Sequence, residues 1–424
     1  MISPASQLNC LGSFFVRCSS GSTAQHDSVH HETDTKPKIL RRRAVHVVHR
    51  HGDRSPITPL KDEAFWASQL VTDATLSKIA SDTKLLTVDA TKKQSARSSH
   101  PFGQLTEIGV TQLIELGSTL RGQLSGENEA SPDEHGRILF PHIWTAQKPL
   151  HPSNIRVIST DFFRTIQSVQ SLLMGLFPGG KMDTVPIDVR HTLWMIPDHK
   201  PRRTEEQVRL EEKLSSRPHV EARERELLPL AIRATRALNP MLSDNAREAE
   251  FGVSQKPIDT SSGEQPLSWN QLAEITKCLA VRDLLPDGIS REDQEAISGH
   301  VAWRWFQVLR HPRLVHVAMG IMVETMINYL QNFSLEPPMI VWSAHDSTLI
   351  GLICAFRLEE PAIWPEYGSY LMVELLEGDL ECDLFVRFSL NGQVLKSQWG
   401  EHPVEMISLT TLAEEIRSQA MKTK

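Results

Sequence analysis

Three short segments of the chain carry side chains that could bind and transfer a phosphoryl group. The first, Arg50-His51-Gly52-Asp53-Arg54, places a guanidinium group on each side of an imidazole. The second contains Arg164, and the third is the pair His345-Asp346. Arginine offers a planar fork of donors that suits phosphate oxygens, and histidine can act as a nucleophile or a base near neutral pH. This set suits phosphoryl transfer better than acyl transfer, because it contains no activated serine or cysteine.

The sequence also predicts that this site needs no metal and no other cofactor. Three arginines could neutralise the charge that Mg²⁺ balances in many phosphoryl-transfer enzymes. The five cysteines are scattered, and no two of them have the spacing of a metal site. His26, His30 and His31 could hold a metal, but solvated histidines are commoner in such a segment.

Each candidate also has an ordinary structural interpretation. A single arginine is usually a surface cation, and Asp161 is typical of a helix N-terminus, so it is given no catalytic role. Asp53 could orient the turn, and His46 and His49 are interpreted as side chains packed on a strand. The functional interpretation is favoured because three separate segments carry complementary chemistry.

A predicted strand precedes each of the three segments. These strands are residues 44–49 (AVHVVH), 155–159 (IRVIS) and 339–344 (MIVWSA). In an open α/β sheet, ligands bind outside the carboxyl ends of the strands. If the three strands are parallel neighbours, their polar segments meet in one crevice. Helix N-termini near residues 54 and 160 would add backbone donors for an anion.

The remaining patterns predict an α/β core with a helical insertion. Residues 104–124 and 160–177 have the periodicity of amphipathic helices. Residues 197–300 show helical patterns and no strand signal, which indicates a cap inserted into a core of residues 39–196 and 301–424. Helix continues over residues 301–331 with an interruption near Pro312, and residues 369–399 contain two or three strands.

The composition indicates a soluble globular protein. Of the 424 residues, 40% are hydrophobic and 23% are charged. The formal net charge of −7 argues against nucleic acid as the main partner. No stretch approaches the roughly 18 apolar residues of a membrane span. Residues 1–38 are interpreted as a disordered extension or a transit segment, and the few cysteines favour a cytoplasmic or mitochondrial protein over a secreted one.

The three segments together resemble the histidine phosphatase superfamily, in its acid phosphatase branch. Residues 50–56 match the RHGxRxP motif, and residues 159–165 resemble the second phosphate-binding stretch of that branch. Residues 343–346 match its late HD motif, and residues 364–367 resemble the segment that follows it. The three motifs in this order are specific. Residues 104–121 also resemble the corresponding helix of lysophosphatidic acid phosphatases.

The resemblance implies a fold, a reaction and a set of roles. The fold would be α/β, with a phosphoglycerate mutase-like three-layer core, a mainly parallel sheet and a helical cap. The reaction would be metal-independent hydrolysis of a small phosphomonoester. His51 would attack phosphorus and form a phosphohistidine, and Asp346 would give a proton to the leaving group. Four further side chains would bind the phosphate oxygens: Arg50, Arg54, Arg164 and His345.

Several alternatives stay open from the sequence alone. A phosphotransferase or mutase could use the same phosphohistidine, although mutases of the superfamily lack the HD motif. A metal-dependent HD-type phosphohydrolase would place the HD pair on a helix, and a non-catalytic phosphate-binding protein would not need both His51 and Asp346. An inositol-phosphate phosphatase would line its cap with lysines and arginines. Residues 197–300 instead balance acids and bases, which favours a monoester with one phosphate and an apolar body, such as lysophosphatidic acid. The sequence does not predict the oligomeric state.

Overall fold

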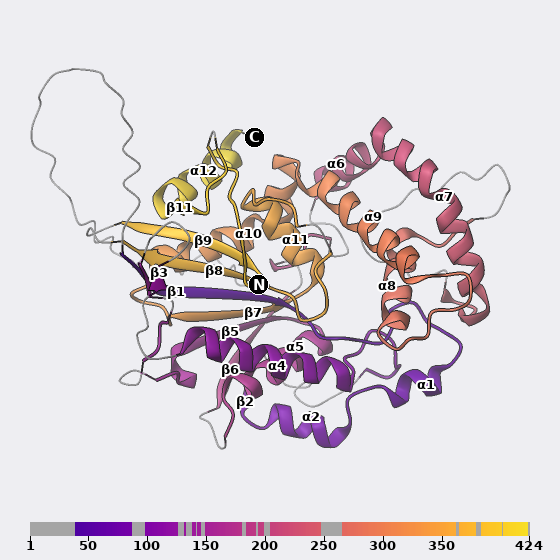
Figure 1. Cartoon of the computed structure of the whole chain (residues 1–424), viewed down its shortest axis with the longest axis horizontal. Coiled ribbons are helices and arrows are strands. Elements are labelled where there is room, and N and C mark those ends of the chain that lie inside the picture. Colours follow the sequence, from indigo (N-terminus) through magenta and orange to yellow (C-terminus); the bar gives the residue numbers. More distant parts are fainter. Residues whose placement is uncertain are drawn as a thin grey trace, which may run out of the picture. The chain divides into compact units, whose positions relative to one another are not determined.

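The computed structural model describes most of the chain from residue 39 to residue 422 (Figure 1). The predicted extension 1–38, with its three histidines, lies outside the described residues, as does most of the predicted loop 126–137. Within 39–422, the residues that are not described are 87–97, 126–130, 133–137, 141, 146–148, 180–183, 192–193, 199–203, 247–264, 362–363, 379–382 and 401.

A mainly parallel β-sheet forms the centre of the described fold. Its strand order is β10-β9-β8-β1-β7-β5-β6-β2, and the five strands from β1 to β2 pair in parallel. Strands β8, β9 and β10 extend it as antiparallel neighbours. The strands are β1 (Ile39–Arg50), β2 (Thr83–Leu85), β3 (Ser131–Pro132), β4 (Ile138–Phe140), β5 (Ile155–Thr160), β6 (Val185–Arg190), β7 (Met339–Ala344), β8 (Tyr370–Glu377), β9 (Leu384–Leu390), β10 (Gln393–Leu395) and β11 (Met406–Ser408).

The three strands that precede the candidate segments are direct neighbours. Strand β1 pairs with β7 in parallel, so that Arg50 lies opposite Ala344. On its other side, β7 pairs in parallel with β5, and Ser343 lies opposite Ser159. This register brings the carboxyl ends of the three strands to one edge of the sheet. The prediction that they are parallel neighbours is confirmed.

Strand β1 is longer than the predicted strand 44–49, and its N-terminal extension includes the charged residues Arg41, Arg42 and Arg43. Arg42 pairs with Glu374 of β8, and Arg43 pairs with Glu377 of the same strand. Arg387 of β9 also donates to Glu374, at 2.8 Å. Charged residues are unfavourable at the start of a buried strand unless they are paired. Carboxylates on the neighbouring strand therefore make the extension of β1 possible.

Helices cover both faces of this sheet.

None of the described helices combines the length and apolar character that crossing a membrane requires. The helices are α1 (Glu63–Ser68), α2 (Asp73–Ala80), α4 (Glu107–Leu124), α5 (Phe163–Leu176), α6 (Glu205–Ser215), α7 (Pro218–Leu238), α8 (Trp269–Ala280), α9 (Arg291–Leu309), α10 (Pro312–Gln331), α11 (Asp346–Ala355) and α12 (Leu409–Lys422), with short 3₁₀ turns at Pro152–Asn154 and Asn239–Met241.

Two hydrophobic clusters, one on each face of the sheet, give the core three layers. Val45 and Val47 of β1 pack into the cluster that α4 and α5 complete. Ala44 and Val48 point to the other face, where the cluster includes α10, α11 and α12. Alternate residues of a strand point to opposite faces, so one strand can contribute to both clusters. Figure 1 shows α4 and α5 on one side of the sheet and α10 to α12 on the other.

The described part of the chain between β6 and β7 contains helices and no strand. Helices α6 to α9 lie beyond one end of the sheet (Figure 1). The predicted interruption near Pro312 is confirmed, because α9 ends at Leu309 and α10 begins at Pro312. However, α9 runs without a break across residue 300, where the predicted cap ends. A capping box of Ser290 and Asp293 starts this helix ten residues earlier than the boundary. The division into core and cap stays a prediction.

Candidate active site

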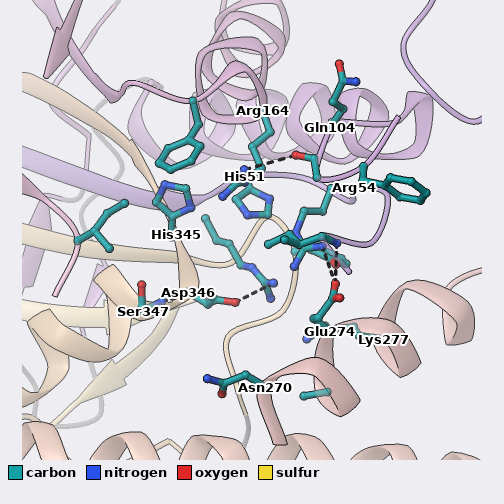
Figure 2. Close-up of a pocket in the computed structure, with 18 of the residues that line it drawn as sticks. His51, Arg54, Gln104, Arg164, Asn270, Glu274, Lys277, His345, Asp346 and Ser347 are labelled. Atoms are coloured by element: carbon teal, nitrogen blue, oxygen red, sulfur yellow. Dashed lines mark hydrogen bonds and ion pairs between the residues drawn. The ribbon is translucent and has the colours of Figure 1, made fainter. Parts of the chain in front are cut away.

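A cavity of about 610 Å³ lies at the carboxyl ends of β1, β5 and β7 (Figure 2). The end of the sheet forms one wall, and α8 and α9 contribute to the opposite wall. All six predicted site residues line it: Arg50, His51, Arg54, Arg164, His345 and Asp346. Residues that are up to 296 positions apart in the sequence, from Arg50 to Asp346, thus meet in one place.

The segment after β1 is held close to α4. A side chain at Gly52 would overlap the backbone of Gly109 in α4, and one at Gly109 would overlap the backbone of Asp53. The amide of Gly52 donates to Ser168 Oγ of α5 at 3.1 Å. Two facing glycines therefore let this segment approach both helices, and His51 follows directly from the strand.

The imidazole of His51 has its lone pair on Nε2. Its Nδ1 lies 2.8 Å from the carbonyl oxygen of Gly52. A carbonyl oxygen only accepts, so Nδ1 carries the proton and Nε2 does not. Burial and the nearby Arg164 hold the pKa of His51 well below its usual value. The ring is therefore neutral and available as a nucleophile.

The three arginines are each fixed by protein groups at one edge. Arg50 donates from Nη1 to Pro365 O at 2.6 Å and stacks on the Tyr367 ring at 4.2 Å. Arg54 donates from Nη1 to Glu274 at 3.0 Å. Arg164 lies over the Phe162 ring at 4.4 Å. Among the described residues, none accepts a hydrogen bond from the buried Nε of any of these three arginines.

These unpartnered donors indicate an anion site. Buried donors are usually paired, so three orphaned guanidinium nitrogens need an acceptor from elsewhere. Burial and the neighbouring Arg54 lower the pKa of Arg164 to about 9, because the cations repel one another. A phosphate group between them would supply acceptors and relieve this repulsion.

His345 and Asp346 follow β7, as predicted, but Asp346 is also the first residue of α11. Thr165 Oγ1 donates to the Thr160 carbonyl at 3.0 Å, and Thr160 Oγ1 donates to Thr165 Oγ1 at 2.9 Å. The hydroxyl oxygen of Thr160 is then left to accept from His345 Nε2, 3.0 Å away. This chain of hydrogen bonds joins β5 to β7 and fixes the His345 ring.

The Asp346 carboxylate is ionised and held in place by three donors. Arg50 Nη2 lies 2.8 Å from Oδ2, Trp364 Nε1 donates to Oδ2 at 3.1 Å, and the Ser347 amide donates to Oδ1 at 2.8 Å. Burial acts to raise the pKa of Asp346, but the positive charge of Arg50 outweighs it and holds that pKa at about 2. The carboxylate is therefore ready to accept a proton. It will hold that proton and donate it only if a change in the surrounding charges raises its pKa.

Two predictions about helix ends are wrong. No helix begins near residue 54: the first helix after β1 starts at Glu63, and the amides of Ile57 and Thr58 donate to Glu274 instead. The second helix begins at Phe163 rather than at residue 160. Asp161 therefore precedes this helix instead of standing in its first turn, and it does not line the cavity.

Three neighbouring side chains are interpreted from the sequence as structural, and their positions agree with that interpretation. His46 and His49 are buried on β1. Asp53 is fully buried and does not line the cavity. Its carboxylate pairs with Arg282 at 2.6 Å and accepts from Thr106 Oγ1 at 2.5 Å.

Helix α8 contributes three polar cavity residues that are not among the predicted site residues. Asn270, Glu274 and Lys277 of α8 line the cavity. Their spacing of four and then three residues places them on one side of a helix in which every residue except Ala273 is buried. A polar stripe on such a helix is the signal that could have identified them. In addition, an apolar wall surrounds the cavity, formed by Ile57, Phe102, Phe162, Phe163, Ile196, Val301, Trp305 and Trp364.

In the part of the chain that the structure describes, no three or more His, Cys, Asp or Glu side chains are grouped as metal ligands would be. The charged groups of the cavity are instead organised around the three guanidinium groups. The arrangement suits a tetrahedral anion next to a neutral imidazole and a carboxylate, which is what phosphoryl transfer to histidine requires.

Comparison with known proteins identifies the class. The profile of the histidine phosphatase superfamily (branch 2) matches residues 43–216. The chain is similar to this superfamily over that part of its length, and relatives named as acid phosphatases extend the likeness over most of the chain. It is an enzyme that hydrolyses phosphoric monoesters.

The relatives span most of the chain at low identity. Lysophosphatidic acid phosphatase type 6 of Mus musculus is 24% identical over 372 residues, which cover 84% of this chain and 80% of that protein. Lysosomal acid phosphatase of Homo sapiens is 25% identical over 80% of this chain and 68% of its own length. Counting factor 60 of Dictyostelium discoideum is 24% identical over 82% of this chain and 79% of that protein.

Solved structures show the same fold. The apo form of Hafnia alvei phytase superposes with a TM-score of 0.58 and 13% identity, over 91% of this chain and 98% of that chain. The phytase of Citrobacter braakii gives a TM-score of 0.55 and 14% identity, over 89% of this chain and 98% of that chain. The predicted α/β core with a mainly parallel sheet is confirmed by this likeness.

Proposed function

We propose that this phosphomonoesterase uses His51 as its nucleophile and Asp346 as its general acid and base. The observation that carries the proposal is the tautomer of His51, whose unprotonated Nε2 belongs to a ring that shares the cavity with three guanidinium groups. A neutral imidazole nitrogen is a good nucleophile, and it is also a good leaving group for water to displace.

The reaction would proceed in two displacements at phosphorus. First, His51 Nε2 forms a bond to phosphorus while the bond to the ester oxygen breaks, and Asp346 gives its proton to that oxygen. The phosphohistidine would be stabilised by the hydrogen bond from Nδ1 to Gly52 O. A water molecule then attacks phosphorus, Asp346 takes its proton, and the P–N bond breaks to release inorganic phosphate.

The phosphate oxygens would be held by three guanidinium groups and one imidazole. Each arginine is anchored at one edge and keeps a buried Nε without a partner in the described part of the chain, which supports this role. The four groups are Arg50, Arg54, Arg164 and His345. They would hold the ester in line with Nε2 and neutralise the charge of the equatorial oxygens, without a metal.

The proton on Asp346 would arrive with the substrate. With a pKa of about 2, the carboxyl group is ionised before substrate binds. A phosphate monoester loses its second proton near pH 6, so below that pH it enters as a monoanion. The negative charge of the bound phosphate opposes that of Asp346 and draws Arg50 away from it, which favours transfer of the proton to the carboxylate.

The cavity favours an ester with one phosphate and an apolar body. Phenylalanine and tryptophan side chains form a large apolar part of the walls outside the phosphate site, and among the described residues Lys277 is the sole lysine that lines the cavity. A polyphosphate would need several cations there, whereas an acyl or aryl group would be well packed. We therefore propose that the substrate is a lysophosphatidic acid-like or aryl monoester rather than an inositol phosphate.

A panel of three esters tests this function. The purified protein is expected to hydrolyse 4-nitrophenyl phosphate and oleoyl lysophosphatidic acid with kcat/KM at least roughly 10-fold above that for inositol hexakisphosphate. An excess of EDTA should leave all three rates unchanged. Trp305→Ala should lower kcat/KM for the lysolipid by about 10-fold and that for the nitrophenyl ester much less, because a long acyl chain buries more apolar surface against this wall than a nitrophenyl group does. Preference for the hexakisphosphate would refute the substrate class, and loss of activity with EDTA would refute the metal-independent mechanism.

A further inference from the structure

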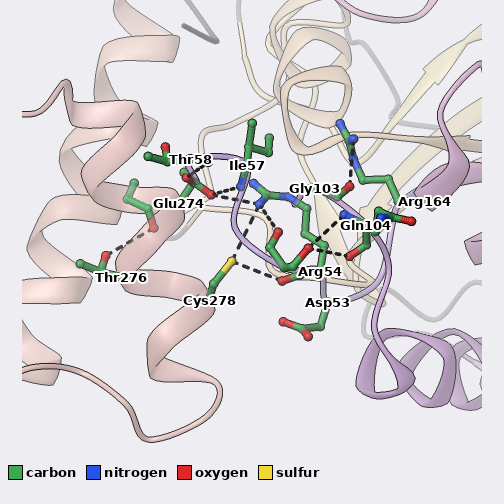
Figure 3. Close-up of polar contacts among 12 residues, drawn as sticks. Asp53, Arg54, Ile57, Thr58, Gly103, Gln104, Arg164, Glu274, Thr276 and Cys278 are labelled. Carbon is green, nitrogen blue, oxygen red and sulfur yellow. Dashed lines mark hydrogen bonds and ion pairs between the residues drawn. The ribbon is translucent and has the colours of Figure 1, made fainter. Parts of the chain in front are cut away.

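Helix α8 presents one buried carboxylate to the segment that carries the site residues (Figure 3). Glu274 is 7% exposed, and both of its oxygens accept hydrogen bonds. Oε1 accepts from the Thr58 amide at 2.9 Å, and Oε2 accepts from the Ile57 amide at 2.9 Å and from Arg54 Nη1 at 3.0 Å. One side chain of the helical region therefore binds three donors of the segment that follows β1.

These contacts fix one edge of the Arg54 guanidinium. Nη1 also donates to Ser55 O at 3.0 Å. One turn further along α8, the thiol of Cys278 donates to the carbonyl oxygen of Arg54 at 3.3 Å. The Nε atom of Arg54 is buried and has no acceptor among the described residues. The side chain is thus held by α8 at one edge and keeps donors for a ligand in the cavity.

We infer that Glu274 is a positioning residue that orients Arg54 for phosphate binding, and that α8 in this way sets the geometry of the phosphate site. The inference rests on the proposed role of Arg54 as a phosphate ligand. An ion pair between two buried groups costs desolvation energy, so it gives little stability for its own sake. What it provides here is a defined direction for a guanidinium group that must meet a phosphate oxygen in line with His51.

A purely structural role for Glu274 is the alternative, and the chain offers a matched control for it. Arg282, just after α8, forms a second buried ion pair with the same segment, to Asp53 at 2.6 Å. The two side chains of this pair are 5% and 0% exposed. Since Asp53 does not line the cavity, this pair can anchor the segment but cannot orient a phosphate ligand.

A double-mutant cycle tests whether Glu274 positions Arg54 or only anchors the segment after β1. The variants are Glu274→Gln, Arg54→Ala and the two combined, and kcat/KM for 4-nitrophenyl phosphate is measured in each. Glu274→Gln is expected to lower kcat/KM roughly 10- to 100-fold in the wild-type background. In the Arg54→Ala background it should change kcat/KM by less than about 3-fold, because the residue through which it acts is gone. Arg282→Gln should change kcat/KM by the same factor in both backgrounds.

The outcomes distinguish this inference from the proposed function. An equal loss from Glu274→Gln in both backgrounds would overturn the inference and leave the function standing. Wild-type activity in Arg54→Ala would instead refute the role of Arg54 as a phosphate ligand. If Glu274→Gln does not fold, Glu274→Asp keeps the charge and displaces it by one methylene, and the same dependence on Arg54 is expected. The thermal midpoint of each variant is measured alongside, and the combined variant should melt above Arg54→Ala, which leaves a buried carboxylate unpaired.

Discussion

At the scale of single residues, the same positive charges set the protonation states of both reacting groups. Arg164 and burial keep the His51 ring neutral, and Arg50 keeps Asp346 ionised. A cation nearby lowers the pKa of an imidazole and of a carboxyl group alike. Before substrate binds, His51 is therefore neutral and can act as a nucleophile, whereas Asp346 is ionised and has no proton to donate.

The role of Asp346 can be tested by changing the leaving group. Asp346→Asn is expected to lower kcat for an alkyl phosphate by about 10²- to 10⁴-fold, because an alkoxide is a poor leaving group without a proton. The loss for 4-nitrophenyl phosphate should be much smaller, since nitrophenolate leaves without help. Steady-state kcat values for both esters provide the comparison.

The control for this test is Asp161→Asn, an acidic residue next to a site strand that does not line the cavity. It should leave both rates close to those of the wild type. Equal losses for the two esters in Asp346→Asn would argue that this carboxylate acts only by holding Arg50.

The sequence predicts which six side chains meet in the cavity, because each lies at a strand end or within a few residues of it. It could not predict Glu274, since the importance of that residue depends on where α8 meets a segment more than 200 positions earlier. The same holds for Thr160, whose contact with His345 exists only because β5 and β7 are neighbours. Local patterns carry no information on contacts of this kind.

At the scale of elements, the site depends on how closely α4 approaches the segment after β1. The facing glycines Gly52 and Gly109 allow backbone to meet backbone there. The amide of Thr106, the N-cap of α4, donates to the Asp53 carbonyl at 3.1 Å. The start of α4 thus defines where His51 and Arg54 leave the sheet.

Two substitutions in α4 test this dependence. Gly109→Ala is expected to destabilise the fold by about 1–3 kcal/mol, because the new methyl group overlaps the backbone of Asp53. It should also lower kcat/KM, since relief of the overlap moves the segment that carries His51. Thermal unfolding and hydrolysis of 4-nitrophenyl phosphate measure the two effects.

Gly122→Ala in the same helix is the matched control. No atom lies within 4 Å of a Cβ at this exposed position, so the substitution should stabilise the helix by about 0.5–1 kcal/mol and leave activity unchanged. If Gly109→Ala behaves in the same way, the close approach does not matter for the site.

The three site strands could be predicted because apolar runs and their polar ends are local features. The contacts of the segment after β1 could not, because the amides of Ile57 and Thr58 donate to Glu274, a residue more than 200 positions later in the sequence.

At the scale of the whole molecule, the fold places the phosphate site beside a wall to which α8, α9 and several loops contribute. Phytases share the fold at 12–14% identity, so the fold by itself does not define the substrate. Selectivity depends on the side chains that α8, α9 and the loops bring to the cavity. Here they combine aromatic and aliphatic side chains with uncharged polar ones, and Lys277 is the one lysine of the described lining.

The class of fold and the reaction could be predicted from three motifs in order, since their spacing along the chain suits three strand ends of one sheet. An intracellular location, cytoplasmic or mitochondrial, stays a prediction. Both cysteines in the described part of the chain, Cys278 and Cys354, are buried and free.

The central claim is that phosphate passes through a covalent bond to His51. Wild-type protein is mixed with a radiolabelled phosphomonoester and quenched in base within the first turnover, because phosphohistidine survives base and is hydrolysed in acid. The account predicts label bound to the peptide that contains His51, and neither label nor hydrolysis in His51→Ala. Label on another residue, or hydrolysis retained by His51→Ala, would contradict it.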